Sequence, residues 1–151
     1  MFRRWPKRDT DKCYFKMPNE VFCLGLDSSE ISIYAYLLRC EDRETYQCHP
    51  SYRTIGQAVK LCENTVRKYV YNLEEKGLVR TEPTTITTKD GRVRNGSLRY
   101  TIRPIREALD CYYQRQLMCA EEEAEKARME KRLAQLSKQK PNHIENGGVR
   151  A

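Results

Sequence analysis

Hydrophobic residues recur at helical spacing in two blocks between Ser51 and Gly77. The first block is Ile55, Ala58 and Val59, and the second is Val66, Tyr69, Val70 and Leu73. Only Lys60-Leu61-Cys62 separates the blocks, which is the length of a tight turn between two crossing helices. Gly77 follows the second block, where a glycine can take the left-handed conformation that ends a helix. The pattern therefore predicts a short helix, a tight turn and a longer helix.

Another amphipathic helix is predicted before this pair. Asp27-Ser28-Ser29-Glu30 has the form of a capping box, in which each acidic side chain accepts a hydrogen bond from the other residue's backbone amide. The apolar residues of this helix, which we expect in the core, are Ile31, Tyr34, Ala35, Leu37 and Leu38. Ahead of it, the stretch 17–22 predicts a short helical turn that brings Val21, Phe22 and Leu24 to the core.

A β-hairpin is predicted after the second helix of the pair. Leu78-Val79-Arg80 begins an extended stretch, and the β-branched run Thr84–Thr88 suits a strand. Residues Ser97–Ile102 alternate between apolar and polar, as a returning strand does. Two turn dipeptides, Asp90-Gly91 and Asn95-Gly96, lie between the strands. The loop from residue 89 to 94 then forms the tip of the hairpin.

The C-terminal part of the chain predicts one long helix. Pro104 suits the first helical position, and the residues from Ile105 to about Gln139 are helix formers without glycine or internal proline. At 1.5 Å per residue such a helix is on the order of 50 Å long, whereas a domain of roughly 100 residues has a radius of gyration near 13 Å. It cannot pack entirely on its own domain.

One side of this helix is apolar. The residues of the stripe recur at spacings of three or four, with Tyr112 and Tyr113 adjacent: Ile105, Leu109, Tyr112, Tyr113, Leu117, Ala120, Ala124 and Ala127. A soluble monomer seldom exposes such a stripe, so we expect a homodimer through residues 105–127. The predicted interface residues are Leu109, Tyr112, Tyr113, Leu117, Ala120 and Ala124. The alternative is that the first turns fold back on Tyr34 and Leu38 while the remainder is a solvated helix of a monomer.

The net charge of +7 is concentrated in one part of the chain. Residues 45–103 carry 11 Lys or Arg and 5 Asp or Glu, whereas residues 1–44 carry 8 of each and residues 104–151 carry 9 and 8. A basic surface confined to one module is typical of a protein that binds a polyanion. A solvated basic face without a partner is the alternative.

Other classes of function find little support. The chain shows no nucleophile paired with a base, no paired carboxylates and no phosphate-binding glycine loop, so we expect no enzyme. The 7 cysteines include no Cys-x-x-Cys and predict neither a disulfide framework nor a zinc ribbon. Cys40, Cys48, His49 and Cys62 match no common zinc spacing, so no metal or other cofactor is expected.

The sequence predicts neither membrane insertion nor secretion. No apolar run reaches the roughly 18 residues that a membrane span requires. The N-terminal residues are basic but lack the apolar stretch of a signal peptide. We therefore expect a cytoplasmic protein without a membrane partner.

The two helices, the turn and the hairpin together resemble the winged helix-turn-helix DNA-binding domains of bacteria. The resemblance covers residues 17–103 and is carried by Ile55–Val59, Leu61, Asn64–Val70 and Leu73–Val79. Two positions depart from the family pattern, because Lys60 replaces a common turn glycine and Cys62 replaces the usual Ser or Thr cap. Cysteine is a poor N-cap, so we expect the first turn of the recognition helix to rely on Glu63 or Thr65.

The resemblance implies a mainly α fold with a small β wing (α+β), followed by the long C-terminal helix. In this interpretation residues 1–16 are a flexible basic arm, which is mobile or reaches DNA. Residues 17–103 are the winged helix-turn-helix domain, residues 104–140 the long helix and residues 141–151 a disordered tail.

Double-stranded DNA is the partner that this fold implies. Arg can bond guanine in a bidentate manner, Asn can do so with adenine, and Glu can accept from cytosine. Residues at the start of the preceding helix are placed near phosphates. The predicted contacts are Tyr52, Arg53, Glu63, Asn64, Thr65, Arg67, Lys68 and Tyr71, together with Lys89, Arg92 and Arg94 at the wing tip. Each could instead be solvated, and Glu63 also suits a first helical turn for electrostatic reasons alone.

The role of such a protein is less determined than its fold. Regulation of transcription is the function expected of this domain. The stretch Met17–Phe22 ahead of the helices looks similar to replication initiators of plasmids and mobile elements. An adaptor that uses the fold for protein contacts is the third hypothesis, because fold alone does not fix function.

Overall fold

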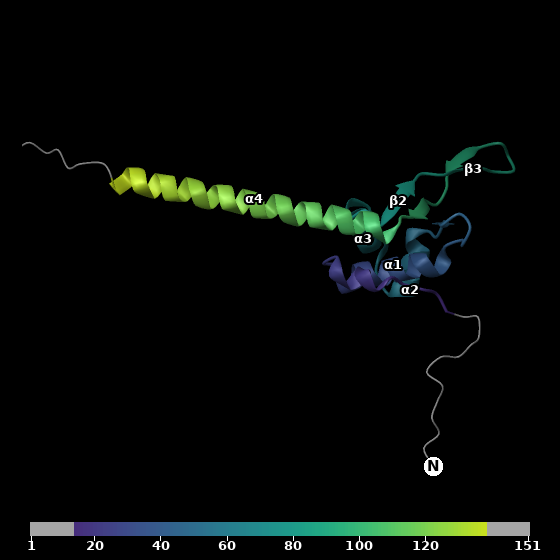
Figure 1. Cartoon of the computed structure of the whole chain (residues 1–151). Coiled ribbons are helices and arrows are strands. Elements are labelled where there is room, and N and C mark those ends of the chain that lie inside the picture. Colours follow the sequence, from purple (N-terminus) through teal and green to yellow (C-terminus); the bar gives the residue numbers. More distant parts are fainter. Residues whose placement is uncertain (1–13, 139–151) are drawn as a thin grey trace, which may run out of the picture. The chain divides into compact units, whose positions relative to one another are not determined.

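A computed structural model describes residues 14–138 of the chain (Figure 1). Its elements, in chain order, are η1 (Asn19–Cys23), α1 (Ser28–Cys40), β1 (Gln47–Cys48), α2 (Tyr52–Val59), α3 (Glu63–Glu75), β2 (Val79–Glu82), β3 (Thr85–Thr87), β4 (Val93–Asn95), β5 (Arg99–Ile102) and α4 (Ile105–Lys138). The chain divides into two compact units after Tyr112. The first turns of α4 thus belong to the same unit as the other elements. Most of the predicted arm, the predicted tail and the last residues of the predicted long helix lie outside the described residues.

The first unit contains the 3₁₀ turn η1, the helices α1, α2 and α3, the first turns of α4, a three-stranded antiparallel sheet and the two-stranded sheet of β3 and β4. The strand order of the three-stranded sheet is β1-β5-β2, with Gln47 opposite Thr101 and Val79 opposite Ile102. Side chains of every helix of this unit and of the three-stranded sheet meet in one core, whose buried members are Val21, Leu24, Ile33, Tyr34, Leu37, Leu38, Cys48, Ile55, Val66, Val70, Leu73, Leu78, Val79, Tyr100 and Ala108. The predicted fold class, mainly α with a β wing and a long C-terminal helix, is confirmed.

The predicted capping box is present at the start of α1, and it has a further partner. Asp27 Oδ1 accepts a hydrogen bond from the Glu30 amide at 2.8 Å, and Glu30 Oε2 accepts one from the Asp27 amide at 2.9 Å. The same Glu30 oxygen lies 2.7 Å from Lys76 Nζ, just after α3. The Glu30 side chain is only 3% exposed. This buried ion pair ties the start of α1 to the end of α3.

The turn between α2 and α3 depends on two special backbone positions. Gly56 is buried in α2, and a Cβ there would overlap the carbonyl oxygen of Leu61. Lys60 ends α2 in the left-handed conformation, at φ +61° and ψ +40°. The glycine that many members of the family have at this position would adopt that conformation without steric cost. The departure seen in the sequence is therefore a point of backbone strain.

Replacing Lys60 with Gly should stabilise the domain by about 1 kcal/mol, because a non-glycine residue at positive φ costs on the order of 1 kcal/mol or more. The increased backbone entropy of the unfolded glycine variant offsets part of this gain. Urea denaturation of the wild type and the Lys60→Gly variant measures the difference. A Lys60→Ala control, which removes the charge but keeps the Cβ, should show no such gain.

Gly77 ends the recognition helix as predicted. Its φ is +77°, and its amide donates to the carbonyl of Glu74 at 3.0 Å. The amide of Leu78 donates back to the carbonyl of Leu73, also at 3.0 Å. These two bonds form a Schellman motif, which satisfies carbonyls that the helix leaves unpaired and turns the chain into β2.

The wing differs from the prediction in its details. Strand β4 was not predicted, and it pairs antiparallel with β3, with Ile86 opposite Arg94. Arg94 therefore lies on a strand, and the prediction that it belongs to the loop at the tip is wrong. Gly96 does not form a second turn, because its amide donates to the Thr84 carbonyl at 2.7 Å across the hairpin. A Cβ on Gly96 would crowd the side chains of Thr84 and Ile86, which explains the glycine by packing.

Two predictions about the core are wrong, and one buried residue was not predicted. Phe22 is 68% exposed because the 3₁₀ turn η1 directs Val21, and not its neighbour, inward. Ala58 is exposed on α2, so the buried side of that helix is narrower than its apolar pattern indicated. Ile33 was not included in the predicted stripe of α1, yet it is fully buried.

The two units contain different parts of α4. In the first unit Ala108 is buried, and Ile105, Leu109 and Tyr112 pack against the core. In the second unit every described side chain from Tyr113 to Lys138 is exposed. No helix within residues 14–138 combines the length and the apolar character needed to cross a membrane.

Candidate nucleic-acid interface

The solvent side of α3 carries the polar residues that the sequence predicted for a DNA groove. Glu63, Asn64, Arg67 and Lys68 are exposed, and Tyr71 is 60% exposed. Asn64, Arg67, Lys68 and Tyr71 lie three, four and seven positions apart, so they occupy one face of the helix. The opposite face is fixed in the core by Val66, Val70 and Leu73. Because its other face is buried in the core, α3 presents these hydrogen-bonding groups in a fixed orientation.

Arg67 is held by an aromatic side chain of the preceding helix. Its guanidinium carbon lies 5.6 Å from the centre of the Tyr52 ring, within the range of a cation–π interaction. Tyr52 is half-buried and packs against the core. Burial raises the pKa of the Tyr52 hydroxyl above its ordinary value. The structure places Tyr52 beneath Arg67, while its neighbour Arg53 is exposed.

The N-terminus of α3 is organised by Cys62 and Thr65. Cys62 occupies the N-cap position without accepting a hydrogen bond from the backbone. Its Sγ lies 2.9 Å from Thr65 Oγ1, so the two side chains meet beside the first turn. The hydrogen bond from Thr65 lowers the pKa of the exposed Cys62 thiol. Thr65 is only partly exposed, and its hydroxyl contacts the Cys62 thiol, so it is less available to DNA than its exposed neighbours.

The wing carries the remaining predicted cations. Lys89 and Arg92 are exposed in the tip, where the Arg92 carbonyl accepts from the Thr88 amide at 2.8 Å. Gly91 turns the chain there at φ +73°. Arg94 is exposed on β4. The tip is therefore a tight, glycine-dependent turn with two cations, and the third cation follows it on the strand.

A carboxylate joins the recognition helix to the base of the wing. Glu74 Oε1 accepts from the Thr81 amide at 3.0 Å, and Glu74 Oε2 accepts from the Thr81 hydroxyl at 2.9 Å. Arg99 on β5 then pairs with Glu82 on β2, which lowers the pKa of that carboxyl. These bonds hold α3, β2 and β5 as one frame.

The predicted dimer residues fall into two groups. Leu109 and Tyr112 pack against the core of their own chain. Tyr113, Leu117, Ala120 and Ala124 are exposed on the second unit. The packing of the first group agrees with the alternative in which the first turns of the helix fold back on their own domain. Only the second group remains available for a dimer interface.

The candidate metal ligands do not gather in the described residues. Nowhere in residues 14–138 do three His, Cys, Asp or Glu side chains come together in a way that could hold an ion. Cys48 is buried beneath α1, where its thiol donates to the Leu37 carbonyl at 3.8 Å, whereas Cys40 and Cys62 are exposed. The absence of a metal or other cofactor stays a prediction.

Comparison with known proteins identifies the central part of the chain. Residues 24–79 match the sequence model of a family described as a helix-turn-helix domain. Within this part of the chain, α2, the tight turn and α3 form the helix-turn-helix. The hairpin that follows it supplies the wing, so the predicted winged helix-turn-helix is confirmed. No curated protein matched the chain significantly.

Several solved structures are similar to the chain. A protein from Methanosarcina mazei Go1, described as a "possible transcriptional regulator", has a TM-score of 0.48 at 16% identity over 72% of this chain and 83% of its own. A MarR-family transcriptional regulator from Silicibacter pomeroyi has a TM-score of 0.39 at 17% identity over 83% and 80%. A mutant of ZitR from Lactococcus lactis, solved in complex with DNA, has a TM-score of 0.36 at 17% identity over 88% and 86%.

Three residues near the candidate interface were not among the contacts predicted from the sequence. Glu74 and Thr81 belong to no recognisable sequence motif. Their hydrogen bond joins a helix to a strand, so it depends on the fold and not on local spacing. Lys60 is an exposed cation in the turn between the two helices of the motif. A signal for it was present, since a lysine in place of the family's turn glycine adds a charge beside the recognition helix.

Proposed function

We propose that this chain binds double-stranded DNA in a sequence-specific manner and regulates transcription, without catalysing a reaction. The observation that carries the proposal is the exposed polar face of α3, seated by its buried face in a helix-turn-helix domain. Asn64 and Arg67 supply groups that read base edges in a major groove. Lys68, Tyr71 and Arg53 suit phosphates, which position a protein on DNA.

The helix-turn-helix family match supports a DNA-binding regulator over an adaptor that makes only protein contacts. The charge supports it as well, because residues 45–103 contain 11 of the 28 basic residues and only 5 of the 21 acidic ones. The exposed wing cations extend the basic surface beyond the motif.

Selection of bound fragments from the genomic DNA of the source organism tests the proposal. A regulator should enrich one or a few sites upstream of genes. Enrichment of repeated sites at a replication origin would support the initiator hypothesis instead. If purified, folded protein enriches no fragment, the DNA-binding function is wrong.

Replacing Arg67 with Ala should weaken binding to the best selected site by roughly 1 to 3 kcal/mol, because it removes a bidentate base contact and its charge. Arg67→Lys keeps the charge, so it should lose specificity while retaining most of the non-specific affinity. Fluorescence anisotropy with the selected site and a scrambled site measures both quantities. Arg106→Ala, which removes an exposed arginine from α4, is the matched control and should have little effect.

We further propose that the second unit forms a homodimer through an antiparallel pair of helices. Leu117 is 64% exposed, and Ala120, Ala124 and Ala127 follow it at spacings of three and four. Small residues at these positions allow two helices to approach closely. Tyr113 extends the same stripe by one turn.

Charge determines the direction of the pairing. Residues 121–125 contain four glutamates, whereas residues 126–132 contain Lys126, Arg128, Lys131 and Arg132 with one glutamate. An antiparallel pair that crosses near residue 126, between the two segments, brings the acidic segment of one helix beside the basic segment of the other. A parallel pair would place like charges opposite one another, which costs free energy.

Replacing Leu117 with Asp should convert the dimer into a monomer, as measured by light scattering at micromolar protein. Met118→Asp is the control, because Met118 is similarly exposed, at 60%, but lies about 100° around the helix. A wild-type mass equal to that of one chain would exclude the dimer. Dissociation by Met118→Asp alone would place the interface on the other side of the helix.

A further inference from the structure

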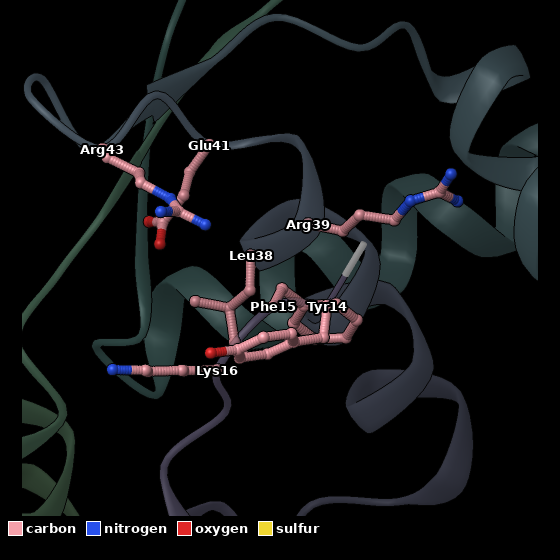
Figure 2. Close-up of a pocket in the computed structure, with 7 residues that line it drawn as sticks. All are labelled: Tyr14, Phe15, Lys16, Leu38, Arg39, Glu41 and Arg43. Carbon is pink, nitrogen blue, oxygen red and sulfur yellow. The ribbon is translucent and has the colours of Figure 1, made fainter. Parts of the chain in front are cut away.

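A cavity of about 880 Å³ lies at the C-terminal end of α1, and none of its lining residues belongs to α3 (Figure 2). Its walls come from the segment before η1, the last turn of α1 and the loop after it. The lining residues are Tyr14, Phe15, Lys16, Leu38, Arg39, Glu41 and Arg43. The cavity is open to solvent, since Tyr14, Phe15, Lys16, Arg39 and Arg43 are all exposed, and its volume is in the range of small-molecule sites.

The lining combines an apolar floor with an excess of positive charge. Figure 2 shows the rings of Tyr14 and Phe15 close to Leu38, with the head groups of Glu41 and Arg43 on one side of them. Three cations, Lys16, Arg39 and Arg43, line the cavity together with one carboxylate, Glu41. This composition favours a molecule that carries an anionic group on an apolar or aromatic body.

Glu41 adds a more specific requirement. Its Oε2 is buried and has no hydrogen-bond partner within the described part of the chain. Burial raises the pKa of this carboxyl. A buried carboxylate oxygen without a donor is unfavourable, so a ligand that brings an N–H or O–H group to this position would gain a hydrogen bond.

The loop that forms one wall of the cavity leads directly to the wing. Asp42 Oδ1 accepts from the amides of Glu44 and Thr45, at 2.8 and 3.1 Å. Tyr46 follows at φ +56°, a strained conformation for a large side chain. Its carbonyl accepts from the Ile102 amide of β5 at 2.9 Å, and the next residues form β1, which pairs with β5.

We propose that this cavity binds a small anionic molecule with an aromatic or apolar body and a hydrogen-bond donor, and that its occupancy changes the affinity of the wing for DNA. Lys16 and Arg43 bind the anion, Tyr14 and Phe15 contact the body, and Glu41 accepts from the donor. The loop 42–46 transmits occupancy to β5, the strand that returns from the wing. This second part rests on the proposed function.

The fluorescent probe 8-anilinonaphthalene-1-sulfonate has all three features: aromatic rings, a sulfonate and an N–H group. Titration of the full chain should give saturable binding at one site. Phe15→Ala and Arg43→Gln should each weaken it about tenfold. The controls are Arg106→Gln, which makes the same charge change elsewhere, and Met118→Asp, which removes exposed apolar surface on α4. Neither control should alter the affinity of the probe.

A second measurement tests the coupling. Saturating probe should change the DNA affinity of the wild type several-fold and leave that of Arg43→Gln unchanged. Probe binding that is unchanged in Phe15→Ala and Arg43→Gln, or that is lost in Met118→Asp, would overturn the site. Probe binding at the site with equal DNA affinity in both states would overturn the coupling. A chain that binds the probe here but no DNA would overturn the proposed function and leave the site standing.

Discussion

Replacing Lys76 with Met should lower the free energy of unfolding by about 3 kcal/mol. Removing one partner of a buried ion pair typically costs about 3 to 5 kcal/mol, because the remaining charge stays buried without compensation. The lower end applies here, since the Lys76 side chain is 27% exposed while that of Glu30 is 3% exposed. The lost bond is the one from Lys76 Nζ to Glu30 Oε2, at 2.7 Å, and a weaker one to the Gly25 carbonyl, at 3.3 Å, is lost with it. Urea denaturation followed by circular dichroism measures the change.

Two further variants test whether the loss of stability comes from breaking the buried ion pair. Lys68→Met makes the same substitution at an exposed position of α3 and should change stability by less than about 0.5 kcal/mol, as surface substitutions usually do. Adding Glu30→Gln to Lys76→Met removes the uncompensated charge, so the double variant should be more stable than Lys76→Met alone. A loss no larger than that of Lys68→Met would show that the ion pair contributes little.

The pair matters for function because of its position. Lys76 directly follows the recognition helix α3. Glu30 lies in the first turn of α1, the helix against which α3 packs. Together with the bonds from Glu74 to Thr81, the pair fixes the C-terminal end of α3 on both sides. A helix held in this way can present its polar face to DNA without first becoming ordered, which avoids an entropic cost of binding.

Local signals explain the parts of the fold that could be predicted. The capping box at Asp27 and Glu30, the left-handed Gly77 and the helical spacing of Val66, Val70 and Leu73 each depend on residues within one or two turns of one another. The exposed polar face of α3 follows from the same spacing, because the buried stripe determines which residues remain on the outside.

Features that depend on distant residues could not be predicted in this way. Glu30 and Lys76 are 46 positions apart, and nothing in the local pattern links them. Strand β1 has only two residues, and it exists because β5 provides a partner. The contact between Arg67 and Tyr52 likewise needs the crossing of α2 and α3. Arg94 was assigned to a loop because Asn95-Gly96 resembles a turn, whereas Gly96 is required by close packing.

DNA affinity should fall roughly 500-fold when the salt concentration rises from 50 to 200 mM. The cations that we expect to contribute are all exposed: Arg53, Arg67, Lys68, Lys89, Arg92 and Arg94. If about five of them neutralise phosphates, the slope of log K against log salt is about −4.5, at about −0.9 per phosphate. Fluorescence anisotropy at four or five salt concentrations gives this slope.

The wing's share of the slope can be separated from that of the recognition helix. Replacing Lys89 and Arg92 with Gln removes both cations of the tip and should reduce the magnitude of the slope by about 1.8, because two phosphate contacts are lost. This double variant should weaken binding to all sequences alike, since phosphate contacts do not read bases. Arg67→Ala should instead weaken the selected site more than a scrambled one. A slope near zero for the wild type would remove the electrostatic basis of the proposal, and equal slopes in both proteins would show that the wing tip does not touch the DNA backbone.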